Sequence, residues 1–185
     1  MVRLPSSLDR RLQILFPNTE ERAQFVAEVV AKALETHDET TMKPAAVGGT
    51  LHLFTDGGSR GNPGKAAIGC VLIDPLKQTV IREYGEAIGV ETNNIAEYRA
   101  LITGMSLAKE YRPNHLICHL DSELVVKQLN GEYRVKMASF QPLIEEIASL
   151  KLEFPSVSFV HVPREENRHA DRLVNAALDA LERSF

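Results

Sequence analysis

The sequence has only two cysteines and no long apolar run, and each of these features excludes a class of protein. No apolar run approaches the roughly 18 residues that a membrane span needs, and the first residues lack the apolar centre of a signal peptide. Cys70 and Cys118 lie in β-like runs without a CxxC partner, which indicates small buried side chains in a reducing compartment. We therefore expect a cytoplasmic protein that does not enter a membrane.

An excess of positive charge is also missing. The 21 Lys and Arg residues are outnumbered by 25 Asp and Glu residues, and the net charge is −4. Such a chain has no global field for holding a polyanion, so a nucleic-acid contact would have to be local or carried by metal ions. The length of 185 residues suits one substantial core with a small appendage.

Residues 1–35 have the pattern of a separate small unit. Residues 2–4 alternate as in a short strand, an apolar stripe before Pro17 predicts a first helix, and Asn18 with Glu21 resembles a capping box that opens a longer helix. This strand–helix–helix order resembles a ribbon-helix-helix module. That resemblance implies a homodimer through residues 1–35 and DNA binding; a helical hairpin used only for packing is the alternative.

The pattern beyond residue 50 predicts a second, larger domain. Residues 36–49 are expected to form a flexible linker, and residues 50–185 a domain of mixed α and β structure. Five strands and four helices are expected, the strands at 51–56, 66–74, 79–89, 115–121 and 157–162, and the helices at 94–111, 123–129, 139–150 and 169–183. Three strands joined by short turns, followed by two strands separated by helices, predict one five-stranded mixed sheet flanked by helices.

Residues 51–64 contain the first candidate functional group and read L-H-L-F-T-D-G-G-S-R-G-N-P-G. An apolar strand leads to Asp56, and the glycines and Pro63 that follow predict that the strand ends there. A carboxylate at the end of a strand is a candidate functional group when it lies beside backbone that other molecules can approach closely. An ordinary hairpin turn is the alternative.

Three more acids lie where apolar side chains are expected. Glu97 lies on the inward stripe of its helix, Asp121 closes an apolar strand, and Asp171 extends a core-facing helical stripe. A helix cap is the alternative for Asp121, and a first-turn acid for Asp171. Four acids at one end of a sheet would repel one another unless cations neutralise them, and oxygen ligands without a Cys/His cluster suit Mg²⁺ or Mn²⁺. The pattern therefore predicts a two-metal phosphoryl-transfer site.

Four blocks of sequence resemble the signatures of type 1 ribonuclease H. They read T-D-G-G-S-R-G-N-P-G, T-N-N-I-A-E-Y-R-A-L, H-L-D-S-E-L-V-V-K-Q-L-N-G-E-Y and H-V-P-R-E-E-N-R-H-A-D-R-L-V-N, in the family's order. The compact V-P-R-E-x-N form is similar to the archaeal-type branch. The resemblance implies a ribonuclease H-like fold and an endoribonuclease that hydrolyses the RNA strand of RNA/DNA hybrids, leaving 5′-phosphate and 3′-hydroxyl ends.

The resemblance also implies the roles of individual residues. Asp56, Glu97, Asp121 and Asp171 would hold two Mg²⁺ ions, for which Mn²⁺ can substitute, one activating water and the other stabilising the leaving 3′ oxygen. The 2′-OH, which DNA lacks, would be sensed by Glu97 and by backbone groups near the first glycines. The substrate-binding residues expected in this way are Gly57, Gly58 and Ser59 at the 2′-OH, Asn93 and Asn94 at the bases, Arg60 and Thr92 at phosphates, and Ser122. Turn chemistry or a solvated surface is the alternative for the polar ones.

Some positions depart from the family pattern. Ser122 is followed by Glu123 where many members have Gln, which weakens the expectation of a base contact there. A second departure concerns a loop histidine that helps product release in many bacterial members. Here His161 falls in a strand and is interpreted as structural, so Arg164, in the next loop, is the expected catalytic substitute. The densely basic protrusion of some members is missing, so substrate affinity is expected to be weak or to come from dimerisation.

Two other functions remain open from the sequence. The chain could be a DNA-binding regulator with a degenerate nuclease fold. The presence of all four acids argues against this, because buried charge is costly in a site that has lost its activity. It could also be a related nuclease acting on DNA junctions or single-strand ends. The Asn93–Asn94 pair and the glycine-rich turn favour the hybrid instead.

Overall fold

The computed structural model describes residues 18–28, 48–135 and 137–183. The chain divides into two units, Met1–Lys43 and Pro44–Phe185, and the boundary falls inside the segment predicted as a linker. In the first unit a helix covers residues 19–28, and Asn18 Oδ1 accepts a hydrogen bond from the Glu20 amide at 2.9 Å, as an N-cap does. The strand and first helix predicted before Pro17, and with them the dimer contact, lie outside the described residues.

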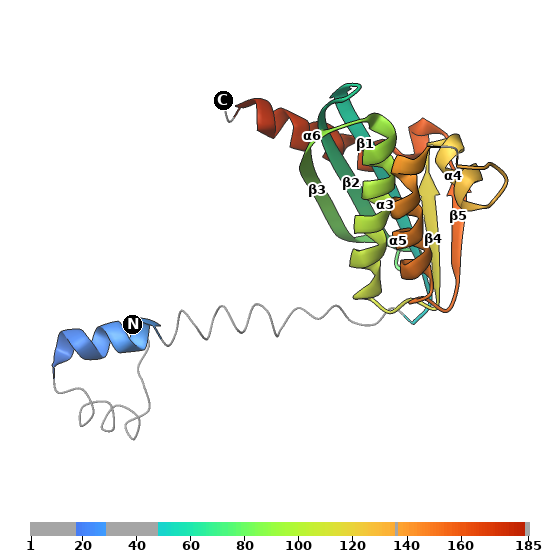
Figure 1. The fold of residues 1–185 in the computed structure, drawn as a ribbon. Coiled ribbons are helices and arrows are strands. Elements are labelled where there is room, and N and C mark those ends of the chain that lie inside the picture. Colours follow the sequence, from blue (N-terminus) through green and yellow to red (C-terminus); the bar gives the residue numbers. More distant parts are fainter. Residues whose placement is uncertain (1–17, 29–47, 136, 184–185) are drawn as a thin grey trace. The chain divides into compact units, whose positions relative to one another are not determined.

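The second unit contains one five-stranded mixed sheet (Figure 1). Its strands are β1 (Thr50–Gly61), β2 (Gly64–Asp74), β3 (Thr79–Glu91), β4 (His115–Leu120) and β5 (Val157–His161), in the spatial order β3-β2-β1-β4-β5. The first three strands pair antiparallel, whereas β4 pairs parallel with both β1 and β5. The predicted fold class, a five-stranded mixed sheet flanked by helices, is confirmed.

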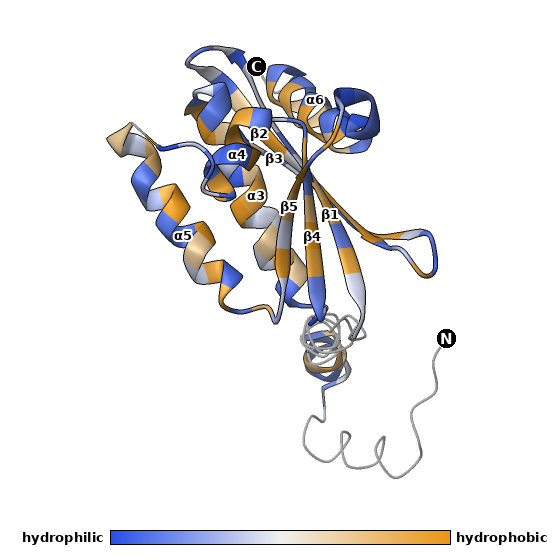
Figure 2. Cartoon of the chain, turned by 90° about the vertical axis from the view of Figure 1, so that its right-hand side faces the viewer, coloured by the Kyte–Doolittle hydropathy of each residue, from blue (hydrophilic) through white to orange (hydrophobic). Residues whose placement is uncertain are grey.

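Helices cover both faces of this sheet. They are α3 (Asn93–Lys109), α4 (Glu123–Leu129), α5 (Gln141–Lys151) and α6 (Arg168–Arg183), with short 3₁₀ turns η1 (Ala138–Phe140) and η2 (Arg164–Glu166). Figure 2 shows α3 and α5 on one side of the sheet and α6 on the other. Alternate β1 residues such as Leu51 and Leu53 are buried toward α3, as the period of two in a strand requires. The residues that alternate with them, His52 and Phe54, stack with His119 of β4 on the opposite face.

Strand β1 is longer than the sequence predicted. The prediction that the glycines end the strand at Asp56 is wrong, because β1 continues to Gly61 in register with β2, with Gly57 opposite Ile68. Of the glycines in β1, only Gly61 has a positive φ, 107°. A Cβ on Gly57 would lie 2.1 Å from the carbonyl carbon of Ala96, so glycine is needed there because α3 packs directly on the strand. These glycines allow close packing and leave the strand intact.

Both cysteines are buried and free, as predicted. The Cys70 thiol donates to the Ala100 carbonyl at 3.2 Å, and burial raises its pKa to about 12, so it stays protonated and unreactive. Among the residues that the structure describes, no helix combines the length and apolar character needed to cross a membrane.

Candidate metal centre and nucleic-acid interface

The carboxylates converge where the parallel pairing of β1 and β4 ends. Thr55 and Leu120 form the last pair, so Asp56 and Asp121 follow at the same end of adjacent strands. Glu97 lies in the first turns of α3, which rests on β1 at Gly57. One carboxylate oxygen from each of Asp56, Glu97 and Asp121 lies within 4.8 Å of the other two. Three acids far apart in the sequence therefore form one cluster.

Burial and mutual repulsion disfavour charge on this cluster. Asp56 and Glu97 are 7% and 5% exposed. Burial, then the nearby charges of Asp121 and Asp171, raise the pKa of Asp56 to about 7, against a smaller opposing effect of Arg164 and of a hydrogen bond from the Gly57 amide. Burial, then Asp56 and Asp121, also raise the pKa of Glu97 well above its usual value. A site that disfavours its own negative charges in this way favours a bound cation.

The oxygens present fit a hard divalent cation. Glu97 Oε2 and Asp121 Oδ1 are buried and have no hydrogen-bond partner within the described part of the chain. Buried carboxylate oxygens are normally satisfied by a donor or a metal, and a set made only of carboxylates suits Mg²⁺ or Mn²⁺. Asp121 is not the N-cap of α4, a position taken by Ser122, so the capping alternative does not account for it.

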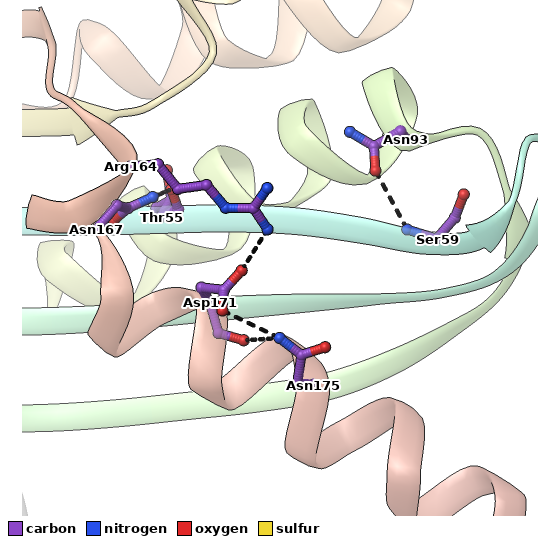
Figure 3. Close-up of polar contacts among 7 residues, drawn as sticks. All are labelled: Thr55, Ser59, Asn93, Arg164, Asn167, Asp171 and Asn175. Carbon is purple, nitrogen blue, oxygen red and sulfur yellow. Dashed lines mark hydrogen bonds and ion pairs between the residues drawn. The ribbon is translucent and has the colours of Figure 1, made fainter.

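Asp171 lies beside this cluster but outside the set of three. It is on the first turn of α6, and Arg164 Nη2 donates to its Oδ1 at 2.8 Å (Figure 3). Asn175, one turn further on, donates to its Oδ2 at 3.1 Å. Asp171 still contributes to the field, because its charge is among the causes that raise the pKa of Asp56. The predicted four-acid site is thus three converging acids plus a fourth held by an arginine and an asparagine.

Asn167 is a buried polar residue at the site, and the sequence pattern did not indicate a role for it there. It is 0% exposed, and its Nδ2 donates to the Thr55 carbonyl at 2.9 Å, one residue before Asp56 (Figure 3). Its own carbonyl accepts the Asp171 amide at 3.1 Å. An asparagine just before a helix indicates a cap in the sequence, but nothing in the pattern indicates that its side chain reaches β1.

The start of α3 is tied to the hairpin formed by β1 and β2. The Ser59 amide donates to Asn93 Oδ1 at 3.3 Å (Figure 3). The Asn93 amide donates to Asn62 Oδ1 at 3.2 Å. The Thr92 hydroxyl accepts the Ile95 amide at 3.3 Å and so caps the helix. Thr92 and Asn93 therefore have the turn chemistry named as the alternative, and their substrate contacts stay predictions.

The other predicted substrate residues are placed as follows. Arg60 forms ion pairs with Asp179 and Glu182 on α6, so a phosphate would have to compete with two carboxylates for it. Gly58 packs against Val174, and Ser122 begins α4 without a side-chain capping bond. Neither position has a contact that identifies it as a substrate group among the described residues.

His161 is exposed at the last position of β5, contrary to its interpretation as a structural side chain. It lies close enough to Glu123 to contribute, after the larger effect of Lys127, to the lowered pKa of that acid. In the sequence, the alternation of β5 suggested a side chain directed into the sheet, but the strand ends before that pattern can bury it.

A cavity of about 470 Å³ opens between the start of α3, helix α4 and the segment before η1. Its lining combines apolar and polar side chains: Asn94, Leu124, Gln128, Glu132, Tyr133, Arg134, Met137 and Phe140. Leu124, Tyr133 and Met137 remain 44%, 50% and 59% exposed. Such exposed apolar and aromatic side chains at a concave surface are typical of a binding site. Asn94, a predicted base contact, is part of this lining.

Known proteins resemble this chain in both sequence and structure. Residues 54–177 match a family model described as reverse transcriptase-like. Ribonuclease HI of Halobacterium salinarum is 36% identical over 155 residues, which cover 84% of this chain and 77% of that protein. The crystal structure of LC11-RNase H1 in complex with an RNA/DNA hybrid superposes with a TM-score of 0.67 at 40% identity, covering 71% of this chain and 98% of that one.

A third relative is much longer. The bifunctional protein Rv2228c of Mycobacterium tuberculosis is 42% identical over 129 residues, which cover 70% of this chain but 35% of that protein. This chain therefore spans only about a third of the length of that relative.

Proposed function

Because this chain belongs to the type 1 ribonuclease H family, we propose that it hydrolyses the RNA strand of RNA/DNA hybrids as an endonuclease, leaving 5′-phosphate and 3′-hydroxyl ends. The observation that carries the proposal is the cluster of Asp56, Glu97 and Asp121, whose oxygens lie within 4.8 Å of one another. Two of these oxygens are buried without a partner among the described residues, as expected of ligands for a cation.

The protein's own groups would act by binding and orientation. Asp56, Glu97 and Asp121 would hold divalent cations, and Asp171 would join them from α6. Cations bound there supply an activated water for attack on phosphorus and positive charge at the leaving 3′ oxygen. Arg164 would orient Asp171 through the 2.8 Å bond and keep positive charge next to the scissile phosphate. Backbone groups of Gly57, Gly58 and Ser59, with Glu97, would sense the 2′-OH.

We assign the second strand of the hybrid to the cavity beside α4. Asn94 lines this cavity and lies in the first turn of α3, close in sequence to Glu97. The RNA strand would then contact the carboxylates, and the DNA strand would contact the cavity. The first turn of α3 would lie between the two strands. Tyr133 offers a half-exposed ring with Lys127 Nζ 5.1 Å from its centroid, and Arg134 adds positive charge. Aromatic rings flanked by cations suit stacking against nucleotides.

Three finer assignments accompany this proposal. Mg²⁺ is the proposed ion, with Mn²⁺ able to substitute, because all the candidate ligands are oxygens. Cytoplasmic localisation is proposed from the two free buried cysteines. A homodimer through residues 1–35 is proposed from the sequence pattern alone.

The direct test is side-by-side digestion of one sequence as RNA/DNA hybrid, double-stranded RNA and double-stranded DNA, with Mg²⁺ and with EDTA. We expect cleavage of the hybrid's RNA strand only, dependent on Mg²⁺, with products that a phosphatase can dephosphorylate at the 5′ end. Cleavage of duplex DNA at a comparable rate, or no cleavage of any of the three, would contradict the proposal.

Tyr133→Ala should weaken hybrid binding with little change in the chemical step. Loss of one stacked nucleotide contact is worth about 1–3 kcal/mol, so KM for the hybrid should rise about tenfold at unchanged kcat. Leu152→Ala is the matched control, because Leu152 is an apolar side chain that is 87% exposed and does not line the cavity. Steady-state kinetics on a fluorescent hybrid measure both constants; a fall in kcat at constant KM would remove Tyr133 from the binding surface.

A further inference from the structure

Asn167 connects the two parts of the site that come from different layers of the fold. Its side chain donates to the Thr55 carbonyl on β1 at 2.9 Å, and its backbone carbonyl accepts the Asp171 amide on α6 at 3.1 Å. Thr55 immediately precedes Asp56, and β1–β4 pairing ends at Thr55. One buried residue therefore bonds both to the backbone next to Asp56 and to the backbone amide of Asp171.

The burial of Asn167 is costly unless the side chain has a role. It is 0% exposed, and its Oδ1 has no partner among the described residues. A buried amide oxygen without a hydrogen-bond partner lowers the stability of the folded protein. Leucine would remove the unpartnered oxygen, but it would also remove the donor to the Thr55 carbonyl. What asparagine adds is the directed bond to the Thr55 carbonyl, which fixes the first turn of α6 against β1.

Asp171 depends on that fixed turn. Its side chain is held by Arg164 and Asn175, which lie in η2 and α6 themselves, so those contacts orient Asp171 within its own segment. The placement of that segment relative to Asp56 must come from contacts across to the sheet. Packing of Val174 and Leu178 against Ala67 on β2 holds the middle of α6. At its start, Ala170 packs on Gly69 of β2, and Asn167 adds the bond to β1 nearest to Asp56.

We propose that Asn167 is a positioning residue that sets the separation between Asp56 and Asp171, and thereby the affinity of the carboxylate site for divalent cations. The inference rests on the proposed function, because it deepens the account of the same site. Asn167 contacts neither cation nor substrate; it acts through the Thr55 carbonyl and the start of α6.

The test compares Asn167→Leu and Asn167→Ala with the wild type by calorimetric Mg²⁺ titration and by the Mg²⁺ dependence of hybrid cleavage. We expect both variants to bind Mg²⁺ about tenfold more weakly, the size of effect seen for residues that orient metal ligands. The Mg²⁺ concentration for half-maximal cleavage should rise by the same factor, with KM for the hybrid unchanged at saturating Mg²⁺. Asn167→Leu fills the volume and removes the unpartnered oxygen, so it should fold at least as stably as Asn167→Ala.

Asn130→Ala is the matched control. Asn130 Nδ2 also donates to a strand carbonyl, that of Phe159 at 3.4 Å, but at the far end of α4. It should lose some stability and keep wild-type Mg²⁺ binding. Wild-type Mg²⁺ affinity in Asn167→Leu would overturn the inference, whatever its melting temperature. If the wild type binds Mg²⁺ but fails to cleave hybrids, the proposed function falls, while the calorimetric comparison still decides the role of Asn167.

Discussion

Replacing Asp56 with asparagine should reduce hybrid cleavage on the order of a thousandfold or more, because residues that only orient a metal ligand already account for 10–100-fold and Asp56 would be a ligand itself. The variant should fold normally. In the absence of metal it should melt at a higher temperature than the wild type, because the substitution removes a desolvated charge that repels Asp121 and Asp171. Loss of activity together with a gain of stability is the expected signature of a residue kept for function.

Asp74→Asn provides the control for that signature. Asp74 is also buried and lies at the other end of the sheet, where its Oδ1 accepts the amides of Leu76 at 3.0 Å and Lys77 at 3.3 Å. Burial works against its ionisation, but the hydrogen bonds from Lys77 and Leu76 outweigh it and lower its pKa. Asp74→Asn should therefore leave cleavage unchanged and lower the melting temperature. Cleavage by Asp56→Asn within tenfold of the wild type would end the assignment of Asp56 as a ligand.

The metal-free protein should lose stability as the pH rises from about 4 to about 7. Asp56 has a folded pKa of about 7 against 3.8 for the free side chain, so the folded state binds more protons than the unfolded state between these values. The raised pKa of Asp56 therefore adds about 4 kcal/mol to the free energy of unfolding at low pH, and this contribution is lost by neutral pH. The raised pKa of Glu97 acts in the same direction.

Urea unfolding at pH 5 and pH 8, with EDTA or with Mg²⁺, measures this effect. With EDTA we expect the protein to be more stable at pH 5. Mg²⁺ should stabilise it mainly at pH 8, because binding requires deprotonated carboxylates. Asp56→Asn should lose the part of the pH dependence that comes from Asp56 and keep the part that comes from Glu97. Equal stability of the wild type at both pH values in EDTA would show that the carboxylates are not desolvated together.

The sequence predicted the sheet and the three central acids because those features depend on local patterns. Apolar runs that end in a carboxylate identified β1 and β4. The structure pairs these two strands in parallel, so Asp56 and Asp121 follow at the same end. Glu97 followed from its place on the inward stripe of α3. The family resemblance added the order of the blocks, and it is confirmed by the relatives in sequence and structure.

What the sequence missed depends on contacts between distant segments. Gly57 looked like a strand breaker because its role, admitting α3, depends on a helix that starts 36 positions later, at Asn93. The partners of Arg60 lie on α6, about 120 residues away in the chain, as the separation of 119 to Asp179 shows. Likewise, Asn167 could be recognised as a helix-start residue, but its bond to Thr55 spans 112 positions. No periodicity encodes such pairings.

The contact at Gly57 has a consequence for how this site can change. Since the backbone of α3 rests where a Cβ would be, 2.1 Å from Ala96, any larger residue would act as a wedge between strand and helix. The wedge would push Glu97 away from Asp56 and widen the span over which two ions could share ligands. Gly57 thus determines how closely Glu97 approaches Asp56. We therefore expect that no other residue is tolerated at position 57, although glycine supplies no ligand.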